Sequence, residues 1–463
     1  MIVEISHTFV TSNYFNLFFE FIKYISPTWY FNVNTKNAYL YFVNYSTLSE
    51  NEKALIAYDS LYSSASISNV DAAYQAFQKG IIKSDQRAFI REEMLPTIAD
   101  NYRFVKKYFH PFWVIYILMI RILGFKNPFV EIYAAIKTYN VSRVNLFQNV
   151  YVNQDYDNFN SKIINTHPKV SVIIPTLNRY KYLKDVLTDL ENQSYKNFEV
   201  IVYDQSTPYD KEFYIGWKLD LKVVNQQEKA LWLARNSALQ QSTGDYILLY
   251  DDDSLVGPDW IENHLKCLDF FNADISSGVS LSVVGAKIPD HYRFFRWSDQ
   301  VDTGNVMIKK EVFLTTGLFD RQFEKQRQGD GEWGMRAYLA GFKNISNPYS
   351  KRVHLKVSDG GLREMGSWDA FRPKKLLAPR PVPSVLYLTR KYFGNKAAWL
   401  SICTNVPPSV IPYRFKRNKY IALFGMLVSI FMFPIIVVSV LKSWNISSRM
   451  LKEGAKISAL NNN

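Results

Sequence analysis

Three adjacent carboxylates, Asp251, Asp252 and Asp253, follow an apolar run of the chain, YILLY. Neighbouring like charges repel unless a cation lies between them, and Mg²⁺ or Mn²⁺ binds one or two protein carboxylates together with water and phosphate oxygens. Alternate side chains of an extended segment point the same way, so Asp251 and Asp253 are predicted to act together. The group indicates a divalent-metal site with room for a diphosphate ligand. A solvated acidic loop is the alternative interpretation.

The elements that must position these carboxylates alternate in type after Pro168. Segments rich in β-branched and aromatic residues predict strands, and segments with apolar residues at helical spacing predict helices between them. Such alternation predicts an α/β fold with a parallel sheet and helices on both of its faces. The predicted strands are 169–176, 198–206, 222–227 and 245–253, and the predicted helices include 179–193 and 230–241.

Polar residues follow three of the predicted strands, at positions 176–178, 204–206 and 251–253. The carboxyl ends of parallel strands lie at one edge of a sheet, and open sheets of this kind bind their ligands at that edge. We therefore expect the three polar groups to meet. A carboxylate at a neighbouring strand end, Asp204, strengthens the prediction of a ligand site there.

Several motifs in this part of the chain resemble those of glycosyltransferase family 2, whose members have the GT-A fold. In the order of the family they are VSVIIPTLNRYKYL, EVIVYDQS, LARNSAL, TGDYILLYDDDS, TGNVMIKKEVF and GDGEWGMRAYLAGF. The resemblance extends from about residue 168 to residue 354, which is less than half of the chain. It implies a Rossmann-like nucleotide-sugar-binding domain in an inverting, nucleotide-sugar-dependent transferase of the bacterial, membrane-associated type.

The resemblance also implies roles for residues at the strand ends. Asp251 and Asp253 are implied to bind the metal and the diphosphate, and His354 stands where some relatives supply a metal-binding imidazole. A lone histidine is more often structural, so ligation is one of two interpretations of His354. The residues implied to bind the nucleotide-sugar are Pro175, Thr176, Asn178, Asp204, Arg235, Asn236, Asp251 and Asp252.

Asp330 corresponds to the carboxylate that acts in this family as general base on the acceptor hydroxyl. Inverting transfer needs such a group on the face opposite the leaving group, where it takes the hydroxyl proton. The family usually has Glu directly before this Asp, whereas this chain has Gly329. Asp330 also stands where a helix would begin, so the structural alternative is an N-cap residue or an acid that stabilises the helix dipole.

Two residues of the same motif, Glu332 and Trp333, are expected near the acceptor. Each has a structural alternative. Glu332 and Arg336 are four residues apart on the predicted helix, a spacing that favours an ion pair. Trp333 either supports an acceptor sugar or packs in the core.

The net charge of +13 is concentrated near the end of the sequence. Between residues 372 and 463 there are 15 Lys and Arg residues and one acid, Glu453. Such a basic segment favours an anionic partner, and the rest of the chain is nearly neutral. The basic residues closest to its apolar run are Arg414, Lys416, Arg417, Lys419, Lys442 and Arg449.

That apolar run, 420–441, contains 22 residues without a charge. A helix of this length is about 33 Å long, which is enough to cross a bilayer core. Cations beside it favour an anionic membrane surface, so we expect a membrane-associating helix. The alternatives are a buried core helix and, because of Pro434, a kinked helix that lies in the membrane interface.

We expect three parts: a mainly helical N-terminal region of unknown role (1–165), a GT-A domain (166–371) and the basic C-terminal segment (372–463). The first part carries no recognisable chemical motif. Its apolar stretch 108–125 is interrupted by His110, Pro111 and Arg121. The uninterrupted core is too short to span a bilayer, so it predicts an interfacial or protein-buried helix.

Together these features predict an inverting glycosyltransferase that moves a single sugar from a nucleotide-sugar donor to a glycan or lipid-linked acceptor, with Mg²⁺ or Mn²⁺ as cofactor. We expect a role in cell-surface polysaccharide synthesis at the cytoplasmic face of the inner membrane, and no nucleic acid as partner. Processive family members carry a Gln-x-x-Arg-Trp motif after the acidic helix. This chain lacks it, which favours transfer of single sugars.

Two other functions stay open. A sugar-phosphate nucleotidyltransferase also uses paired carboxylates and Mg²⁺, but it would normally carry a Gly-rich phosphate loop where this chain has IPTLNRYKYL. A non-enzymatic nucleic-acid-binding protein would use the basic, aromatic segment YRFKRNKY. The uncharged run next to that segment fits a bilayer better than a nucleic acid.

Overall fold

The computed structural model describes residues 19–33, 35, 41–83, 95–282, 287–299, 301–357, 360–361, 369–372, 375, 377–411 and 419–461. The chain divides into two compact units. Among the described residues, the larger unit lies within 153–391 and 405–461, and the smaller one lies within 19–152 and 392–404. The larger unit therefore includes the whole predicted nucleotide-sugar-binding region.

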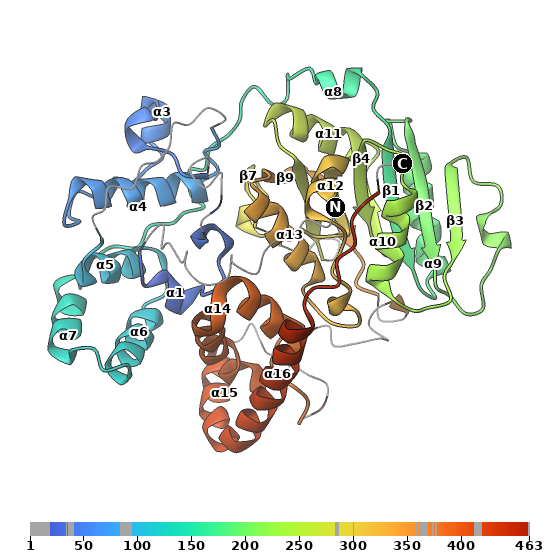
Figure 1. Ribbon diagram of the computed structural model, residues 1–463. Helices are drawn as coiled ribbons and strands as arrows, with labels where there is room; N and C mark the ends of the chain where they lie inside the picture. The colour runs from blue at the N-terminus through green and yellow to red at the C-terminus, as the bar shows by residue number, and fades with distance from the viewer. Residues whose placement is uncertain are drawn as a thin grey trace. The chain divides into compact units, whose positions relative to one another are not determined.

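One mixed β-sheet forms the centre of the larger unit (Figure 1). Its strands are β1 (Val170–Thr176), β2 (Phe198–Asp204), β3 (Asp220–Asn225), β4 (Tyr246–Tyr250), β5 (Ser254–Val256), β6 (Ile275–Leu281), β7 (Arg296–Trp297), β8 (Asn305–Lys309) and β9 (Asn344–His354). Their order within the described residues is β3-β2-β1-β4-β8-β6-β9-β5, and β7 pairs with β9. The strands β3, β2, β1 and β4 are parallel, which confirms the predicted sheet, and β8 continues it in the antiparallel direction.

The strands at the centre of the sheet are buried on both faces. Every residue of β1 and β2 is buried, whereas the edge strand β3 is partly exposed. Burial of both faces is typical of α/β sheets that helices cover on both sides. The helices of this part are α8 (Lys162–Asn165), α9 (Tyr180–Glu191), α10 (Leu231–Gln241), α11 (Trp260–Phe270), α12 (Lys310–Thr316) and α13 (Gly329–Ala340).

Helix α9 shows how the sequence pattern produces this packing. Leu183, Val186, Leu187 and Leu190 follow the spacing i, i+3, i+4 and i+7, and all four side chains are fully buried. They form the single apolar face that an amphipathic helix turns toward a core. The mixed sheet with its covering helices confirms the expected α/β class.

The run 420–441 is not one continuous helix, and the kinked alternative based on Pro434 describes its backbone better. The chain forms two helices, α15 (Lys419–Phe431) and α16 (Phe433–Glu453), which are separated at Met432. Pro434 lies in the first turn of α16, and proline is favoured there because its nitrogen has no hydrogen to donate to a preceding helical turn. Within the described part of the chain, no helix combines the length and the hydropathy that crossing a bilayer requires. The cations Arg414, Lys416 and Arg417 lie outside the described residues.

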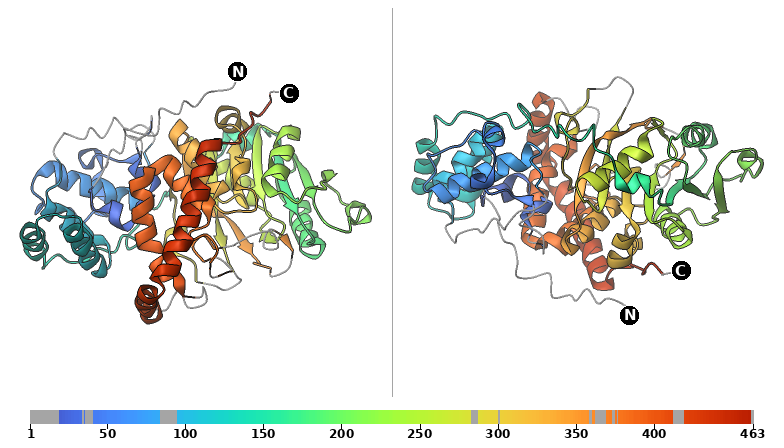
Figure 2. Two further views of the ribbon diagram at one scale, coloured as in Figure 1. Left: turned by 60° about the horizontal axis from the view of Figure 1, so that its bottom comes forward. Right: turned by 90° about the horizontal axis from the view of Figure 1, so that it is seen from above.

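After α16 the C-terminal tail runs back toward the sheet, as Figure 2 shows in red. The Leu318 N–H donates to the Ser458 carbonyl at 2.9 Å, and Gln240 Nε2 donates to the Ala459 carbonyl at 2.8 Å. These bonds connect the tail to the loop after α12 and to α10. The last part of the sequence thus belongs to the same compact unit as the sheet.

The smaller unit is helical and has no strand among its described residues. A capping box between Thr97 and Asp100 begins one of its helices, α5, in the way that such sequences favour. This confirms the mainly helical character expected for the N-terminal region. The helices before residue 153 are α1 (Ile22–Ile25), α3 (Glu50–Lys53), α4 (Ala65–Gln78), α5 (Ile98–Tyr108), α6 (Phe112–Leu123) and α7 (Pro128–Lys137). Part of α14 (Pro383–Asn405) also belongs to this unit.

Candidate active site

The three adjacent carboxylates lie between β4 and β5, beyond the carboxyl end of β4. Strand β5 pairs with β9 in the antiparallel direction, and the register places Ser254 opposite His354. In addition, the Leu355 N–H donates to the Asp253 carbonyl at 2.9 Å. The sheet therefore brings His354 next to Asp253 from a distant part of the sequence.

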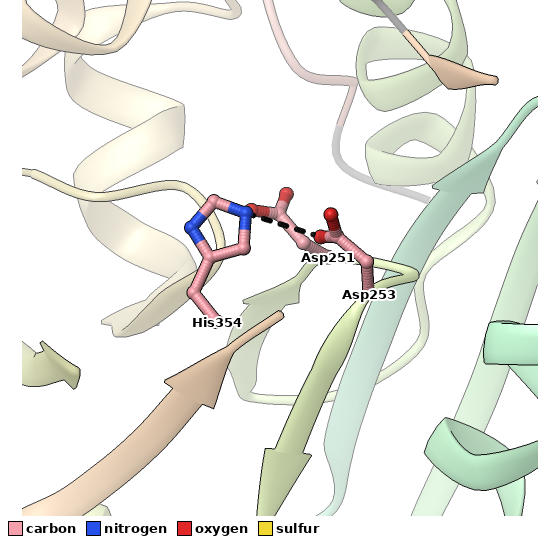
Figure 3. Close-up of side chains that lie close together, drawn as sticks. All are labelled: Asp251, Asp253 and His354. Carbon is pink, nitrogen blue, oxygen red and sulfur yellow. Dashed lines mark ion pairs between the residues drawn. The ribbon is translucent and has the colours of Figure 1, made fainter. Parts of the chain in front are cut away.

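Asp251, Asp253 and His354 point toward one another, as Figure 3 shows. Each residue offers one ligand atom, and these atoms lie within 4.8 Å of one another. His354 Nε2 is 3.2 Å from Asp253 Oδ1. Two carboxylates and an imidazole form a donor set that suits a divalent cation. The three residues predicted as metal ligands are thus together, and their chemistry fits a divalent metal ion.

Asp252 does not join this group, as the predicted pairing of Asp251 with Asp253 implied, although residues 252 and 253 form a turn rather than an extended segment. Its Oδ2 accepts a hydrogen bond from Thr176 Oγ1 at 2.8 Å, and its Oδ1 accepts one from Arg179 Nη1 at 2.8 Å. Burial raises the pKa of the Asp252 carboxyl to about 6, although the charge of Arg179 opposes this shift. Thr176 and Asp252, both predicted to contact the nucleotide-sugar, are therefore bonded to each other.

Arg179 bridges the two acids of the turn. Its Nη1 lies 3.2 Å from Asp253 Oδ2 as well as beside Asp252. Gly361 packs against the guanidinium with φ +64°, and a Cβ at that position would lie 2.6 Å from Arg179 Cζ. Position 361 therefore requires glycine both for its backbone and for its space. The sequence analysis missed Arg179, which it placed only at the start of a helix.

Two arginines hold Asp251. Arg235 Nη2 is 3.0 Å from Asp251 Oδ1, and Arg352 Nη1 is 2.7 Å from Asp251 Oδ2. Burial alone would raise the pKa of Asp251, but the charges of Arg352 and Arg235 lower it below its ordinary value. A Cβ at Gly304 would overlap Arg352 and Asp251. The glycine of the TGN motif thus leaves room for this ion pair.

Arg352 connects Asp251 to a further acid, Asp302. Its Nη2 donates to both carboxylate oxygens of Asp302, at 2.9 and 2.8 Å, and its Nε donates to Ser280 Oγ at 2.7 Å. The sequence analysis missed Arg352 and Asp302. The only signal for Arg352 is that it precedes His354 by two residues on β9, so that the two side chains point to the same face of the strand.

Asp204 ends β2 and is fully buried. Its Oδ2 accepts hydrogen bonds from the hydroxyls of Tyr180 at 2.6 Å and Tyr214 at 2.8 Å, and its Oδ1 accepts one from the Ser206 N–H at 2.8 Å. Burial and the bond to Asp204 raise the pKa of Tyr180 to about 12. Asp204 therefore lies at the predicted edge, with its carboxylate already bonded to two tyrosines.

The loops after β1 and β2 are tied together at this edge. Asn178 is exposed and has a left-handed backbone, with φ 56°. Its N–H donates to Ser206 Oγ at 2.8 Å, and its Oδ1 accepts from the Thr207 N–H at 2.9 Å. Pro175 precedes Thr176 on β1 and lies opposite Tyr203 of β2 in the strand register. Together with the Thr176–Asp252 bond, these contacts confirm that the three polar groups meet at one edge of the sheet.

The prediction that Asn236 binds the nucleotide is not supported. Asn236 Nδ2 donates to the Phe319 carbonyl at 2.9 Å, and its Oδ1 accepts from the Phe319 N–H at 2.9 Å. Both polar atoms of the buried amide are thus used to hold the loop after α12. Its neighbour Arg235, by contrast, reaches Asp251 at the site.

Asp330 is the second residue of α13 and is partly buried. Its Oδ1 accepts from the Gly331 N–H at 2.8 Å. The residue at the N-cap position is Gln328, so Asp330 is not the capping residue of this helix. The alternative of an N-cap is therefore wrong, whereas Asp330 does lie in the first turn of α13, where an acid stabilises the helix dipole, so that alternative stays open.

The electrostatic environment of Asp330 is shared with the metal-ligand group. Burial raises the pKa of the Asp330 carboxyl, the charge of Asp302 adds to the shift, and the charges of Arg327 and Arg235 oppose it. Arg235 is also the ion-pair partner of Asp251, and Asp302 is bound to the same Arg352. Asp330 thus interacts electrostatically with residues that pair with the carboxylates at the strand ends.

Gly329 replaces the Glu that the family usually has before this Asp. A Cβ at position 329 would overlap the indole ring of Trp232. Trp232 is buried, and its Nε1 donates to the Phe323 carbonyl at 3.1 Å. The fixed indole therefore excludes any side chain at position 329.

The expectation that Glu332 and Trp333 contact the acceptor is wrong, because both side chains are fully buried. Glu332 pairs with Arg336 Nε at 3.0 Å and Lys391 Nζ at 2.9 Å. The Trp333 Nε1 donates to the Gly317 carbonyl at 3.1 Å, and its ring centroid is 4.6 Å from that of Phe313. The alternatives of an ion pair and a core tryptophan are confirmed.

Part of the chain is similar to known glycosyltransferases. Residues 171–330 match the family model for Glycosyl transferase family 2. Glycosyltransferase GlyA from Streptococcus pneumoniae serotype 4 is 32% identical over 117 residues, which are 24% of this chain and 16% of GlyA. Poly(ribitol-phosphate) beta-N-acetylglucosaminyltransferase TarS from Staphylococcus aureus is 28% identical over 187 residues, which are 37% of this chain and 32% of TarS. The chain thus spans a third or less of the length of these relatives.

Solved structures show a weaker similarity. Residues 1–349 of S. aureus TarS in complex with UDP-GlcNAc align with a TM-score of 0.42 and 16% identity, over 64% of this chain and 97% of that chain. The mannosyltransferase PcManGT from Pyrobaculum calidifontis in complex with GDP-Man and Mn²⁺ aligns with a TM-score of 0.37 and 17% identity, over 65% of this chain and 84% of that chain. The fold assignment depends on the sheet topology and the family match instead.

Proposed function

We propose that this chain, whose residues 171–330 are a glycosyltransferase family 2 domain, transfers a single sugar with inversion from a nucleotide-sugar donor to a glycan or lipid-linked acceptor. The observation that carries the proposal is the convergence of Asp251, Asp253 and His354 at the carboxyl edge of the sheet, with Asp330 in the same electrostatic environment. A role in cell-surface polysaccharide synthesis accords with the names of the relatives, such as TarS.

The donor's diphosphate is assigned to the strand-end residues. Asp251, Asp253 and His354 would hold a divalent cation, Mg²⁺ or Mn²⁺, which stabilises the charge of the leaving nucleoside diphosphate when bound. An imidazole ligand favours Mn²⁺ of the two, because first-row transition metals bind nitrogen donors more strongly than Mg²⁺ does. This choice belongs to the proposal and awaits a direct measurement.

Arg235 has an unused hydrogen-bond donor that is available to a phosphate oxygen. Its Nη2 bonds to Asp251 and to the Thr303 carbonyl, while its buried Nε has no hydrogen-bond partner among the described residues. A buried guanidinium N–H without a partner costs free energy unless a ligand accepts its hydrogen bond. We therefore assign Arg235 to the donor's diphosphate.

Asp330 is assigned as general base. Its carboxylate would take the proton of the acceptor hydroxyl while that oxygen forms the bond to sugar C1 and the bond from C1 to the diphosphate breaks. The raised pKa of Asp330 makes it a stronger base than an exposed aspartate, which suits this task.

A thermal-shift screen tests donor binding. The full chain is heated with UDP-, GDP- and dTDP-linked sugars, with and without Mn²⁺ or Mg²⁺, and with EDTA. A ligand that binds only the native state raises the melting temperature by mass action, so one nucleotide class should do so only with the cation. His354→Ala should remove the cation dependence, and His167→Ala, a histidine of the chain outside the metal-ligand group, serves as its control. A shift without a cation, equal in wild type and His354→Ala, would contradict the metal assignment.

The C-terminal helices α15 and α16, joined by a kink at Met432, support the proposal that the protein associates with the cytoplasmic face of the inner membrane. Apolar side chains at its bend are exposed, among them Ile430, Phe431 and Phe433, and the cations Lys442 and Arg449 follow on α16. Apolar area and nearby cations together favour an anionic membrane surface. Cell fractionation tests this: extraction should require detergent, whereas release by nuclease and salt would indicate a nucleic-acid partner instead.

A further inference from the structure

Helices α6 and α7 of the smaller unit lie side by side and form a hairpin (Figure 1) that exposes apolar side chains. On α6 the exposed positions follow the spacing i, i+4 and i+8, and on α7 they follow i and i+4, so each helix presents one continuous face. Their exposed fractions range from 51% to 99%. We call this set the hairpin surface: Ile115, Met119, Leu123, Phe125, Phe129 and Tyr133.

The hairpin surface is not needed for the folding of the smaller unit. The opposite sides of α6 and α7 pack in the core, where Ile117 and Ala134 are buried with Tyr102 and Val105 of α5. A surface helix of a soluble protein normally has a polar outer face. α6 is apolar on both sides, and at 12 residues it is too short to span a bilayer. Its outer face therefore has an apolar partner other than this core.

Exposed charges on the hairpin itself have one sign. Between residues 109 and 149 the only acid is Glu131, and it is buried in an ion pair with Arg121, with Nη2 and Oε1 2.7 Å apart. The cations Lys126, Lys137 and Arg143 are exposed. Glu20, an acid whose charge acts on Lys126, is paired with Lys23. An apolar face with an excess of cations beside it is complementary to an anionic lipid surface.

The tip of the hairpin is fixed. The Lys126 N–H donates to the Arg121 carbonyl at 3.0 Å, and Asn127 caps α7 by accepting from the Phe129 N–H at 3.0 Å. Between them Phe125 adopts φ 58°, a conformation that costs energy for a residue with a Cβ, and its ring is 99% exposed. The backbone thus holds a phenylalanine outward at the point farthest from the core of the helices.

We propose that the α6–α7 hairpin inserts the hairpin surface into the interface of an anionic lipid bilayer, as a membrane-docking element separate from the C-terminal helices α15 and α16. The apolar side chains lie among the upper acyl chains, and Lys126 and Lys137 contact lipid phosphates. This goes beyond the proposed function, because it involves no residue of the candidate active site and no transfer step. A second copy of the chain is a poorer partner, since a two-fold contact would oppose the same cations on both copies.

A fluorescent label on α6 reports on insertion at this element alone. Cys403→Ser removes the exposed cysteine, while Cys267 stays unlabelled because burial raises the pKa of its thiol to about 12. Leu123→Cys then carries an environment-sensitive label on the hairpin surface. Leu61→Cys is the matched control, because Leu61 is 75% exposed in the same unit but lies outside the hairpin.

Vesicles of phosphatidylglycerol and phosphatidylcholine should shift the emission of the label at position 123 to the blue and leave that at position 61 unchanged. Replacing Phe125 and Phe129 by Ser should weaken partitioning by roughly tenfold or more per residue. Lys126→Gln should weaken it about fivefold. Both phenylalanines are at least 82% exposed, so the melting temperature should stay the same in these variants.

Three results would overturn the proposal. Vesicles that bind the protein without a shift at position 123 would place membrane contact elsewhere, for example at the C-terminal helices α15 and α16. A blue shift without lipid that grows with protein concentration would identify a second copy as the partner. An equal shift with neutral phosphatidylcholine vesicles would show that the cations do not select anionic lipid.

Discussion

The raised pKa of Asp330 determines the pH at which its carboxylate accepts a proton. A general base works only when it is deprotonated, so activity falls as the pH drops through its pKa. We expect the acid limb of the kcat/KM profile to lie above the ordinary aspartate pKa of about 3.9. Initial rates of donor consumption between pH 4 and 8 measure this limb. A limb at or below the ordinary value would contradict the role of burial.

Asp330→Asn should lower kcat by roughly 10²–10⁴-fold, the contribution typical of general bases, with little change in donor affinity. The amide keeps the shape of the side chain and its bond to the Gly331 N–H. Asp290→Asn, an acid on the surface with 45% of its side chain exposed, is the control and should keep full activity. A fully active Asp330→Asn enzyme would remove the base from the mechanism.

Arg352 is buried between Asp251 and Asp302, so its loss leaves Asp302 without a counter-charge, while Asp251 keeps Arg235. Arg352→Gln should lower the free energy of unfolding by about 1–3 kcal/mol, because both carboxylates are partly exposed. The second change Asp302→Asn should recover part of that loss, because it removes the unpaired charge. Denaturant unfolding of both variants measures the effects. Strictly additive losses would contradict the coupling.

The control for Arg352 is Arg293→Gln. Arg293 forms an ion pair with Asp290 on the surface, with 59% of its side chain exposed. Surface pairs of this kind contribute about 0–1 kcal/mol. The Arg→Gln change at position 293 should therefore have little effect on the free energy of unfolding. Both variants lose the same charge, so the difference between positions 352 and 293 reports the effect of burial.

Glu199 on β2 makes stability depend on pH. Burial opposes ionisation of this carboxyl, but hydrogen bonds from Lys222, Ser171 and Thr243 lower its pKa to about 2. Its contribution to stability is complete above the unfolded-state pKa near 4.3 and is lost as the pH falls toward 2. Glu199→Gln should cost on the order of 2 kcal/mol at pH 7 and much less at pH 3. Urea unfolding at both pH values tests this, with exposed Glu311→Gln as control.

Sequence reasoning identified the residues that carry charge at the site but not how they pair. Asp251 and Asp253 could be predicted because adjacent acids at the end of a buried strand attract a cation, and His354 because of its place in the family pattern. Arg352 was missed because its position opposite Asp251 depends on the register between β5 and β9, which no local pattern encodes. Asn236 was misassigned because its partner, Phe319, is distant in the sequence.

At the scale of elements, α14 contains a backbone break that can be tested in isolation. Gly394 has φ 79° and ψ 170°, a region that is essentially closed to residues with a side chain. A Cβ there would meet no atom within 4 Å, so only backbone strain would oppose it. Gly394→Ala should therefore cost about 1–3 kcal/mol in thermal or urea unfolding. Lys396→Ala, exposed on the same helix, should cost less than about 0.5 kcal/mol. Equal effects would contradict the backbone argument.

The first half of the sheet could be predicted because each parallel strand is followed by a helix with a clear apolar face. Strand β1 and helix α9 match the predicted ranges within one or two residues. The antiparallel pairs of β8 with β4 and of β9 with β5 join segments far apart in the sequence, so composition and periodicity do not reveal them. The break at Met432 was left open because Pro434 is compatible with a kink as well as with a helix start.

At the scale of the whole molecule, function is divided among parts of the chain. The predicted donor and base residues belong to the larger unit, while the hairpin surface belongs to the smaller one. Most of the basic excess lies in the C-terminal segment. We expect that removing the apolar side chains of the hairpin surface, or the exposed apolar side chains of α15 and α16, reduces membrane binding while hydrolysis of the soluble donor continues.

The most direct test of the central claim needs no acceptor. The chain is incubated with Mn²⁺ and with the nucleotide-sugar that stabilises it. Water then takes the place of the acceptor, and ¹H NMR identifies which anomer of the free sugar is released first. An α-linked donor should give the β-anomer and nucleoside diphosphate in equal amounts, and Asp330→Asn should abolish both. Release of the α-anomer, or formation of pyrophosphate from nucleoside triphosphate and sugar phosphate, would contradict inverting glycosyl transfer at this site.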